Sequence, residues 1–145
     1  MTLDEFATIH ARHKEAEPLR FSKLPPDRLA SADDLQMVQN KLDVVLPEKL
    51  VTFLSRYGGG DFLRLAIFSA QPDSRWYLPA RNGAGLRNVP HDFLIVSDDG
   101  CGGNYGLRIE GRVVGDPIFY NDTDDGSVTR TEYADIFEFV AANAY

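Results

Sequence analysis

The chain of 145 residues is 43% hydrophobic and 26% charged. These values suit one soluble globular domain over residues 1–145, and no apolar run approaches the roughly 20 residues that cross a bilayer. The single cysteine, Cys101, excludes an internal disulfide framework and a cysteine-rich zinc site. The net charge of −7 disfavours nucleic acid as a partner, because an acidic surface repels phosphates. The acidic start of the chain does not resemble a secretory signal, so we expect a cytoplasmic protein that does not bind membranes.

The first part of the chain carries signals for helices. Thr2 and Ser31 each stand three residues before an acidic residue, which is the spacing of a capping box. They predict helices that begin just after these two residues, the second running to about Leu42. Three prolines between them predict a loop over residues 17–30.

A third helix is predicted from Pro47 to Tyr57. Pro47 suits the first helical position, since its fixed φ is already helical. The apolar residues follow the i, i+3, i+4, i+7 spacing of one helix face: Leu50, Phe53, Leu54 and Tyr57. Glycines at 58–60 then end the helix. Because the link from the second helix is so short, we expect these two helices to pack against each other.

Beyond Asp61 the pattern changes to strands. Short β-prone runs separated by turn residues predict strands at 62–68, 75–78, 92–97, 104–109, 112–114 and 117–120. Their short connections favour antiparallel pairing. A last helix is predicted from about Glu132, capped by Thr131. This order predicts an α+β domain with N-terminal helices, an antiparallel or mixed sheet and a C-terminal helix.

No segment carries a strong catalytic or metal-binding signal. Asn121 at the first position of a calcium loop would place Asp125 at the fifth and Glu132 at the twelfth. Asn121 and Thr123, however, stand where carboxylates are expected, and a predicted strand precedes the loop where an EF-hand has a helix. Cys101 has no motif that would supply a base. The sequence therefore predicts no catalytic residue, no metal site and no cofactor.

The acidic residues are concentrated in one part of the chain. Residues 1–91 hold 11 acidic and 12 basic side chains, whereas residues 92–135 hold 10 acidic and only 3 basic ones. Such a segment would attract a basic protein partner. The simpler interpretation is that these charges only keep the protein in solution.

Four segments follow one another in an order that is typical of a known family. They are Leu42–Glu48 with Tyr57–Gly60, Phe93–Gly100 with Gly103–Tyr105, Gly115–Asn121 and Ile136–Val140. From about residue 31 to the end, the chain resembles the SUKH superfamily of cell-wall assembly regulators. Gln39 stands where this family often has an acidic residue.

The resemblance implies a non-enzymatic binding module. Bacterial members are similar to immunity proteins that neutralise a cognate toxin, often a nuclease, by binding it. A nuclease carries a basic groove for phosphates, which an acidic surface could occupy. We expect this surface to consist of Asp98, Asp99, Asp122, Asp124 and Asp125, with Tyr105 and Tyr120 as aromatic anchors.

Two other functions remain open. Fungal relatives are regulatory interaction proteins, so the partner could be a host protein or peptide instead of a toxin. Alternatively, the acidic turn after Tyr120 could bind a metal and make the protein metal-dependent.

Overall fold

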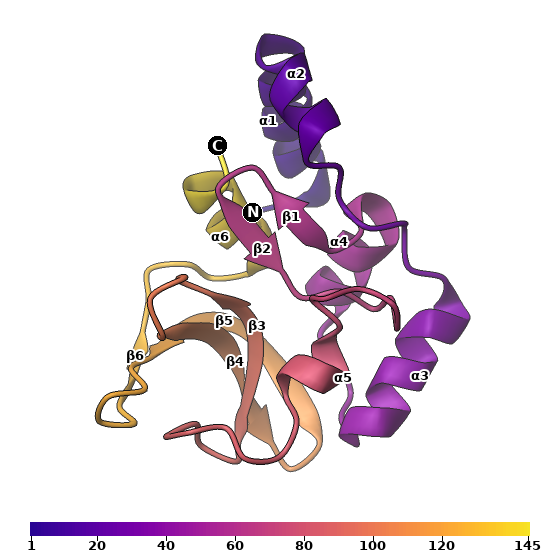
Figure 1. Ribbon diagram of the computed structural model, residues 1–145. Coiled ribbons are helices and arrows are strands. Elements are labelled where there is room, and N and C mark those ends of the chain that lie inside the picture. Colours follow the sequence, from indigo (N-terminus) through magenta and orange to yellow (C-terminus); the bar gives the residue numbers. More distant parts are fainter.

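A four-stranded antiparallel sheet forms the lower left part of the computed structural model, which describes residues 1–145, in the view of Figure 1. Its strands are β3 (Phe93–Asp98), β4 (Asn104–Glu110), β5 (Val113–Asn121) and β6 (Val128–Arg130), paired in that order. Leu94, Leu107 and Ile118 lie opposite one another on neighbouring strands, and all three are buried. This register fixes which face of the sheet joins the core.

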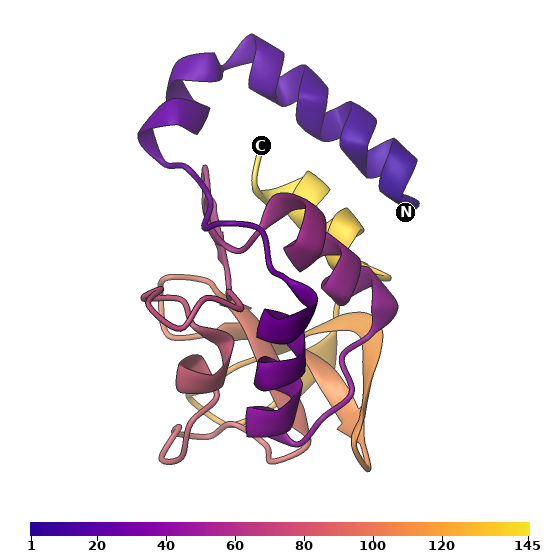
Figure 2. The same cartoon turned by 90° about the vertical axis from the view of Figure 1, so that its right-hand side faces the viewer.

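The structure has six helices: α1 (Leu3–Ala16), α2 (Pro18–Lys23), α3 (Ala32–Leu42), α4 (Glu48–Tyr57), α5 (Leu78–Arg81) and α6 (Ile136–Asn143). They lie above the sheet and on one side of it in Figure 1. α6 packs against β5 and also contacts α1 and α4, while α1 and α2 arch over the top of the molecule (Figure 2). Phe6, Phe53 and Phe137 join these helices, with ring centroids 5.2 to 6.2 Å apart. The α+β prediction is confirmed. No helix has both the length and the apolar character needed to cross a bilayer.

The predicted helix starts are confirmed at both capping boxes. The side chains of Thr2 and Ser31 accept from the backbone N–H groups of Glu5 and Asp34. In return, the carboxylates of Glu5 and Asp34 accept from the backbone N–H groups of Thr2 and Ser31. α4 starts one residue later than predicted, because Pro47 is extended and serves as its N-cap. α4 ends where the glycines begin, since Gly58 has a φ of 72° and a Cβ there would overlap the carbonyl of Asp27.

Three predictions in the first hundred residues are wrong. The proline-rich segment 17–30 contains the helix α2, which starts at Pro18 because proline is tolerated in a first turn. The strand predicted at 62–68 is a hairpin of β1 (Gly60–Phe62) and β2 (Leu65–Ile67). The strand predicted at 75–78 is a turn leading into α5, held by the backbone of Ser69.

Later boundaries also differ from the predictions. Residues 113–114 and 117–120 belong to the single long strand β5, whereas Arg112 lies in the turn before it. β5 tolerates Pro117 because its ladder with β4 is irregular there. The short strand β6 was not predicted. α6 starts at Ile136 instead of Glu132, because Asp135 caps it by accepting from Glu138 N–H, while Thr131 donates its hydroxyl to Ile118.

α3 and α4 do not form the helix pair that was expected. α3 lies mainly against α5, and α4 lies mainly against α6. The link between α3 and α4 is held instead by Gln39, whose side-chain oxygen accepts from Leu46 N–H at 2.8 Å. The residue that departs from the family pattern therefore has a structural contact.

Candidate functional site

The two acidic turns lie side by side at one end of the sheet. β4 and β5 are antiparallel, with Asn104 opposite Asn121. The turn before β4 and the turn after β5 therefore lie at the same end of the sheet, beside β6 in Figure 1. The hydroxyl of Thr123 donates to the carbonyl of Gly102 at 2.6 Å and joins them. We call residues 98–103 and 122–127 together the acidic end.

Asp99 organises the first turn. One of its carboxylate oxygens accepts from the N–H groups of Cys101 and Gly103 at 2.7 and 2.9 Å, and the other accepts from the Tyr120 hydroxyl at 2.8 Å. Burial alone would raise the pKa of Asp99, but these hydrogen bonds outweigh it and hold the pKa below its ordinary value. Asp99 therefore stays ionised and fixes the shape of the turn.

Tyr120 and Tyr105 form a cross-strand pair beside this turn. Their ring centroids are 5.2 Å apart, and Tyr105 also lies 4.8 Å from Phe139 of α6. The hydrogen bond to Asp99 raises the pKa of Tyr120 to about 12, so its hydroxyl remains a donor. Both rings are partly buried, and Tyr120 also supports the turn through Asp99. Their role as aromatic anchors for a partner stays a prediction.

The second turn exposes its carboxylates. Asp122 accepts from Asp124 N–H and Asp125 from Ser127 N–H, each with one oxygen, while the side chain of Asp124 has no hydrogen bond. Asp124 and Asp125 are exposed, as is Asp99, and Asp98 and Asp122 are half-buried. None of the five predicted aspartates takes part in an ion pair. All five aspartates therefore lie on one negatively charged surface, and no basic side chain neutralises them through an ion pair.

Two asparagines hold this surface in place, and neither role was predicted from the sequence. Asn121 is completely buried and donates to the carbonyls of Asn88 and Ser127. Asn88, with a φ of 53°, donates to the carbonyl of Thr123 at 2.7 Å. Asparagine tolerates a left-handed backbone, but nothing local in the sequence indicates that Asn88 and Thr123 meet.

The acidic end adjoins an open groove. The β1–β2 turn and α6 face Asp98, Asp99 and Tyr105 across a groove of about 400 Å³. It also contains Arg64, which forms no ion pair. No group of three or more His, Cys, Asp or Glu side chains is placed to hold a metal ion.

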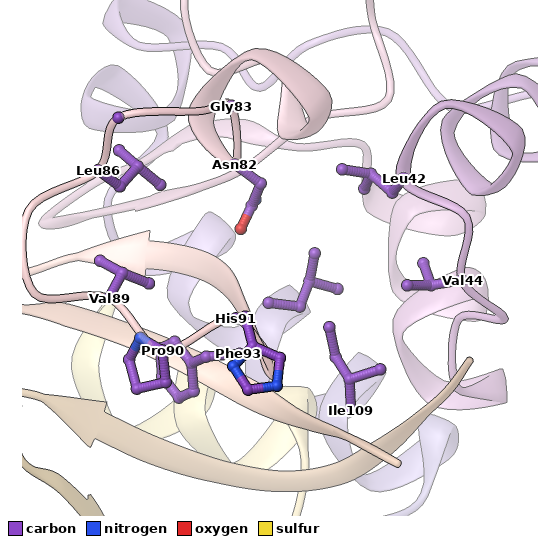
Figure 3. A pocket seen from close by; sticks show the side chains of 12 residues that line it. Leu42, Val44, Asn82, Gly83, Leu86, Val89, Pro90, His91, Phe93 and Ile109 are labelled. Atoms are coloured by element: carbon purple, nitrogen blue, oxygen red, sulfur yellow. The ribbon is translucent and has the colours of Figure 1, made fainter. Parts of the chain in front are cut away.

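A second hollow of about 260 Å³ lies near the opposite end of the sheet (Figure 3). Apolar side chains from the end of α3, from the 82–91 loop and from the sheet face one another there, among them Leu42, Leu86 and Ile109. Asn82 is held by two hydrogen bonds to the backbone of Ile95. His91 is the one ionisable residue of the lining, so this hollow offers no acid–base pair.

Comparison with known proteins places the acidic end within a family domain. Residues 32–140 match the family described as SMI1-KNR4 cell-wall. No curated protein matches the chain. The matched segment includes both acidic turns and the whole sheet, and it begins after α1 and α2.

Proposed function

Because the chain belongs to the SMI1-KNR4 cell-wall family, we propose that it is a non-enzymatic binding protein that neutralises a basic toxin domain, such as a nuclease, by direct contact. The observation that carries this proposal is the acidic end. Its five aspartates come from two turns far apart in sequence, they lie on one edge, and none of them is paired with a cation.

Charge complementarity supports a basic partner. The phosphate-binding groove of a nuclease has a positive potential, and unpaired carboxylates opposite it would steer the encounter and suppress wrong partners. Hydrogen bonds of Asp99, Thr123 and Asn121 already hold the two turns in the unbound protein. Less conformational entropy is then lost on binding.

We assign different roles to the aspartates and tyrosines of the acidic end. Asp98, Asp122, Asp124 and Asp125 would contact the partner directly. Asp99 would act mainly by holding the first turn and Tyr120. Tyr105 would form one wall of the adjoining groove, where a side chain of the partner could enter.

The test compares two triple variants that change the charge equally. Asp122→Asn, Asp124→Asn and Asp125→Asn alter the acidic end, while Glu15→Gln, Asp73→Asn and Glu110→Gln alter exposed residues elsewhere. With the protein encoded by the neighbouring gene as partner, we expect the first variant to bind about tenfold more slowly and the second to bind like the wild type. Equal binding by both variants would overturn the proposal.

A regulatory role is the second candidate, favoured by the cell-wall description of the family. The same surface would then bind a basic segment of a host regulator. Co-purification from the native cell distinguishes the two functions. A toxin encoded next to this gene is expected under the first, and a partner encoded elsewhere under the second.

A further inference from the structure

The segment before the matched family region forms one side of a hollow, and α4 and the β1–β2 hairpin form the other side. α1 and α2 arch over α4 (Figure 2), and between them and the β1–β2 turn lies a space of about 330 Å³. This size is at the lower end of the range for small-molecule sites, about 300–1,000 Å³. Leu24 and Leu29 at its edge remain 46% and 56% exposed.

Aromatic rings line much of this hollow. His10, Phe21, Tyr57 and Phe62 all contribute, together with two prolines. The His10 ring lies 5.4 Å from Phe21 and 5.0 Å from Tyr57, between centroids, in edge-to-face arrangements. Such walls favour a flat apolar ring, because aromatic pairs gain contact energy beyond the area that they bury.

The charges at the hollow favour an anion. Lys14 and Arg56 line it, and neither forms an ion pair or a side-chain hydrogen bond within the protein. The one acidic residue of the lining is Asp61, and Arg75 holds both of its oxygens at 2.9 and 3.0 Å. The hollow therefore has two positively charged side chains without an acidic partner, because its one carboxylate is already paired with Arg75.

His10 adds a polar group inside the hollow. Its Nδ1 lies 2.6 Å from the Tyr145 hydroxyl, whereas its Nε2 has no partner in the protein. Burial lowers the pKa of His10, so the ring is neutral at pH 7, and burial raises the pKa of Tyr145, so the phenol keeps its proton. With Tyr145 donating to Nδ1, the remaining ring proton is on Nε2, which can donate to a ligand.

We propose that this hollow binds a small aromatic monocarboxylate, with its ring among His10, Phe21 and Tyr57 and its carboxylate at Lys14 and Arg56. The site differs from the acidic end in charge and in the segments that form it. It does not depend on the proposed binding of a toxin.

The experiment uses two matched probes and three single variants. Naphthylacetate supplies an aromatic ring with a carboxylate, and naphthylethanol supplies the same ring without the charge. Affinities of both are measured by calorimetry for the wild type, Lys14→Gln, Arg56→Gln and the control Arg12→Gln. Arg12 is an exposed cation of α1 that does not line the hollow.

We expect the wild type to bind naphthylacetate about fivefold more tightly than naphthylethanol, as one exposed ion pair allows. Lys14→Gln and Arg56→Gln should each reduce this preference, because one of the two cations is lost, and Arg12→Gln should keep it. NMR shifts should centre on His10 and Tyr57. Equal affinity for the two probes, no binding of either at millimolar concentration, or shifts centred on residues 122–127 would each overturn the proposal. If Arg56→Gln fails to fold, the comparison of Lys14→Gln with the wild type is sufficient, because Lys14 is exposed on α1.

Discussion

Gly103 leaves the space in which Tyr120 and Asp99 meet at the acidic end. A Cβ at this position would overlap the hydroxyl of Tyr120 and lie 2.6 Å from a carboxylate oxygen of Asp99. The absence of a side chain is what allows Tyr120 to reach Asp99. The turn, the tyrosine and the carboxylate therefore form one unit.

We expect Gly103→Ala to destabilise the protein by about 1–3 kcal/mol, the usual cost of overpacking. Urea denaturation measures this cost. Gly115→Ala is the matched control, because a Cβ there would meet its nearest atom at 3.7 Å, an ordinary contact. A Gly103→Ala protein as stable as this control would show that Tyr120 can move aside without cost.

At the scale of elements, Asp135 joins two helices. It caps α6 through Glu138 N–H, and its carboxylate, which is fully buried, is bonded to Lys49 of α4. Burial raises the pKa of Asp135, but hydrogen bonds from Lys49 and Glu138 N–H outweigh burial and hold the pKa below its ordinary value. The carboxylate is therefore more stable ionised in the folded protein than in the unfolded one.

We expect Asp135→Ala to cost about 2–4 kcal/mol of stability, because the cap is lost and Lys49 loses its partner. Asp135→Asn should cost less, since asparagine also caps helices. The folded pKa is the lower one, so this contribution is present above the unfolded pKa of about 4 and is lost as the pH falls through the folded value. The difference between wild type and Asp135→Asn, from urea denaturation at several pH values, should shrink in acid. A difference that stays constant down to pH of about 2 would contradict this assignment.

The range over which a sequence signal acts explains why some elements were predicted and others were not. Helix starts at Thr2 and Ser31 follow from capping boxes, which act within a few residues. The segment 75–78 contains Trp76 and Tyr77, which are β-prone, yet Ser69 holds it as a turn. Backbone hydrogen bonds with Ser69 outweighed the local β preference there.

At the scale of the whole molecule, the uneven distribution of charge acts on a partner at the longest range. Ten of the 13 charged residues between 92 and 135 are acidic, and the fold concentrates five of them at the acidic end. The proposed association with a basic partner should therefore depend on ionic strength.

We expect the association rate to fall about tenfold or more between about 0.1 M and about 1 M salt, as the Debye length shortens from about 10 Å to about 3 Å. Stopped-flow mixing measures this rate. The variant Asp122→Asn, Asp124→Asn, Asp125→Asn should show a weaker salt dependence, and the control variant Glu15→Gln, Asp73→Asn, Glu110→Gln should retain most of it. The same salt dependence in both variants would indicate that the partner responds to net charge alone.

The sequence by itself determined the α+β class, the starts of α1 and α3, that of α4 to within one residue, the antiparallel strands β3, β4 and β5, and the identity of the acidic residues. These follow from caps, apolar spacing and turn residues, which operate over a few neighbours. Only the tertiary structure decided that two separate turns share one edge, through Thr123, Asn88 and Asn121, and that α1 and α2 enclose an aromatic hollow. These features consist of contacts between segments far apart in the chain, and no local pattern encodes which distant segments will meet.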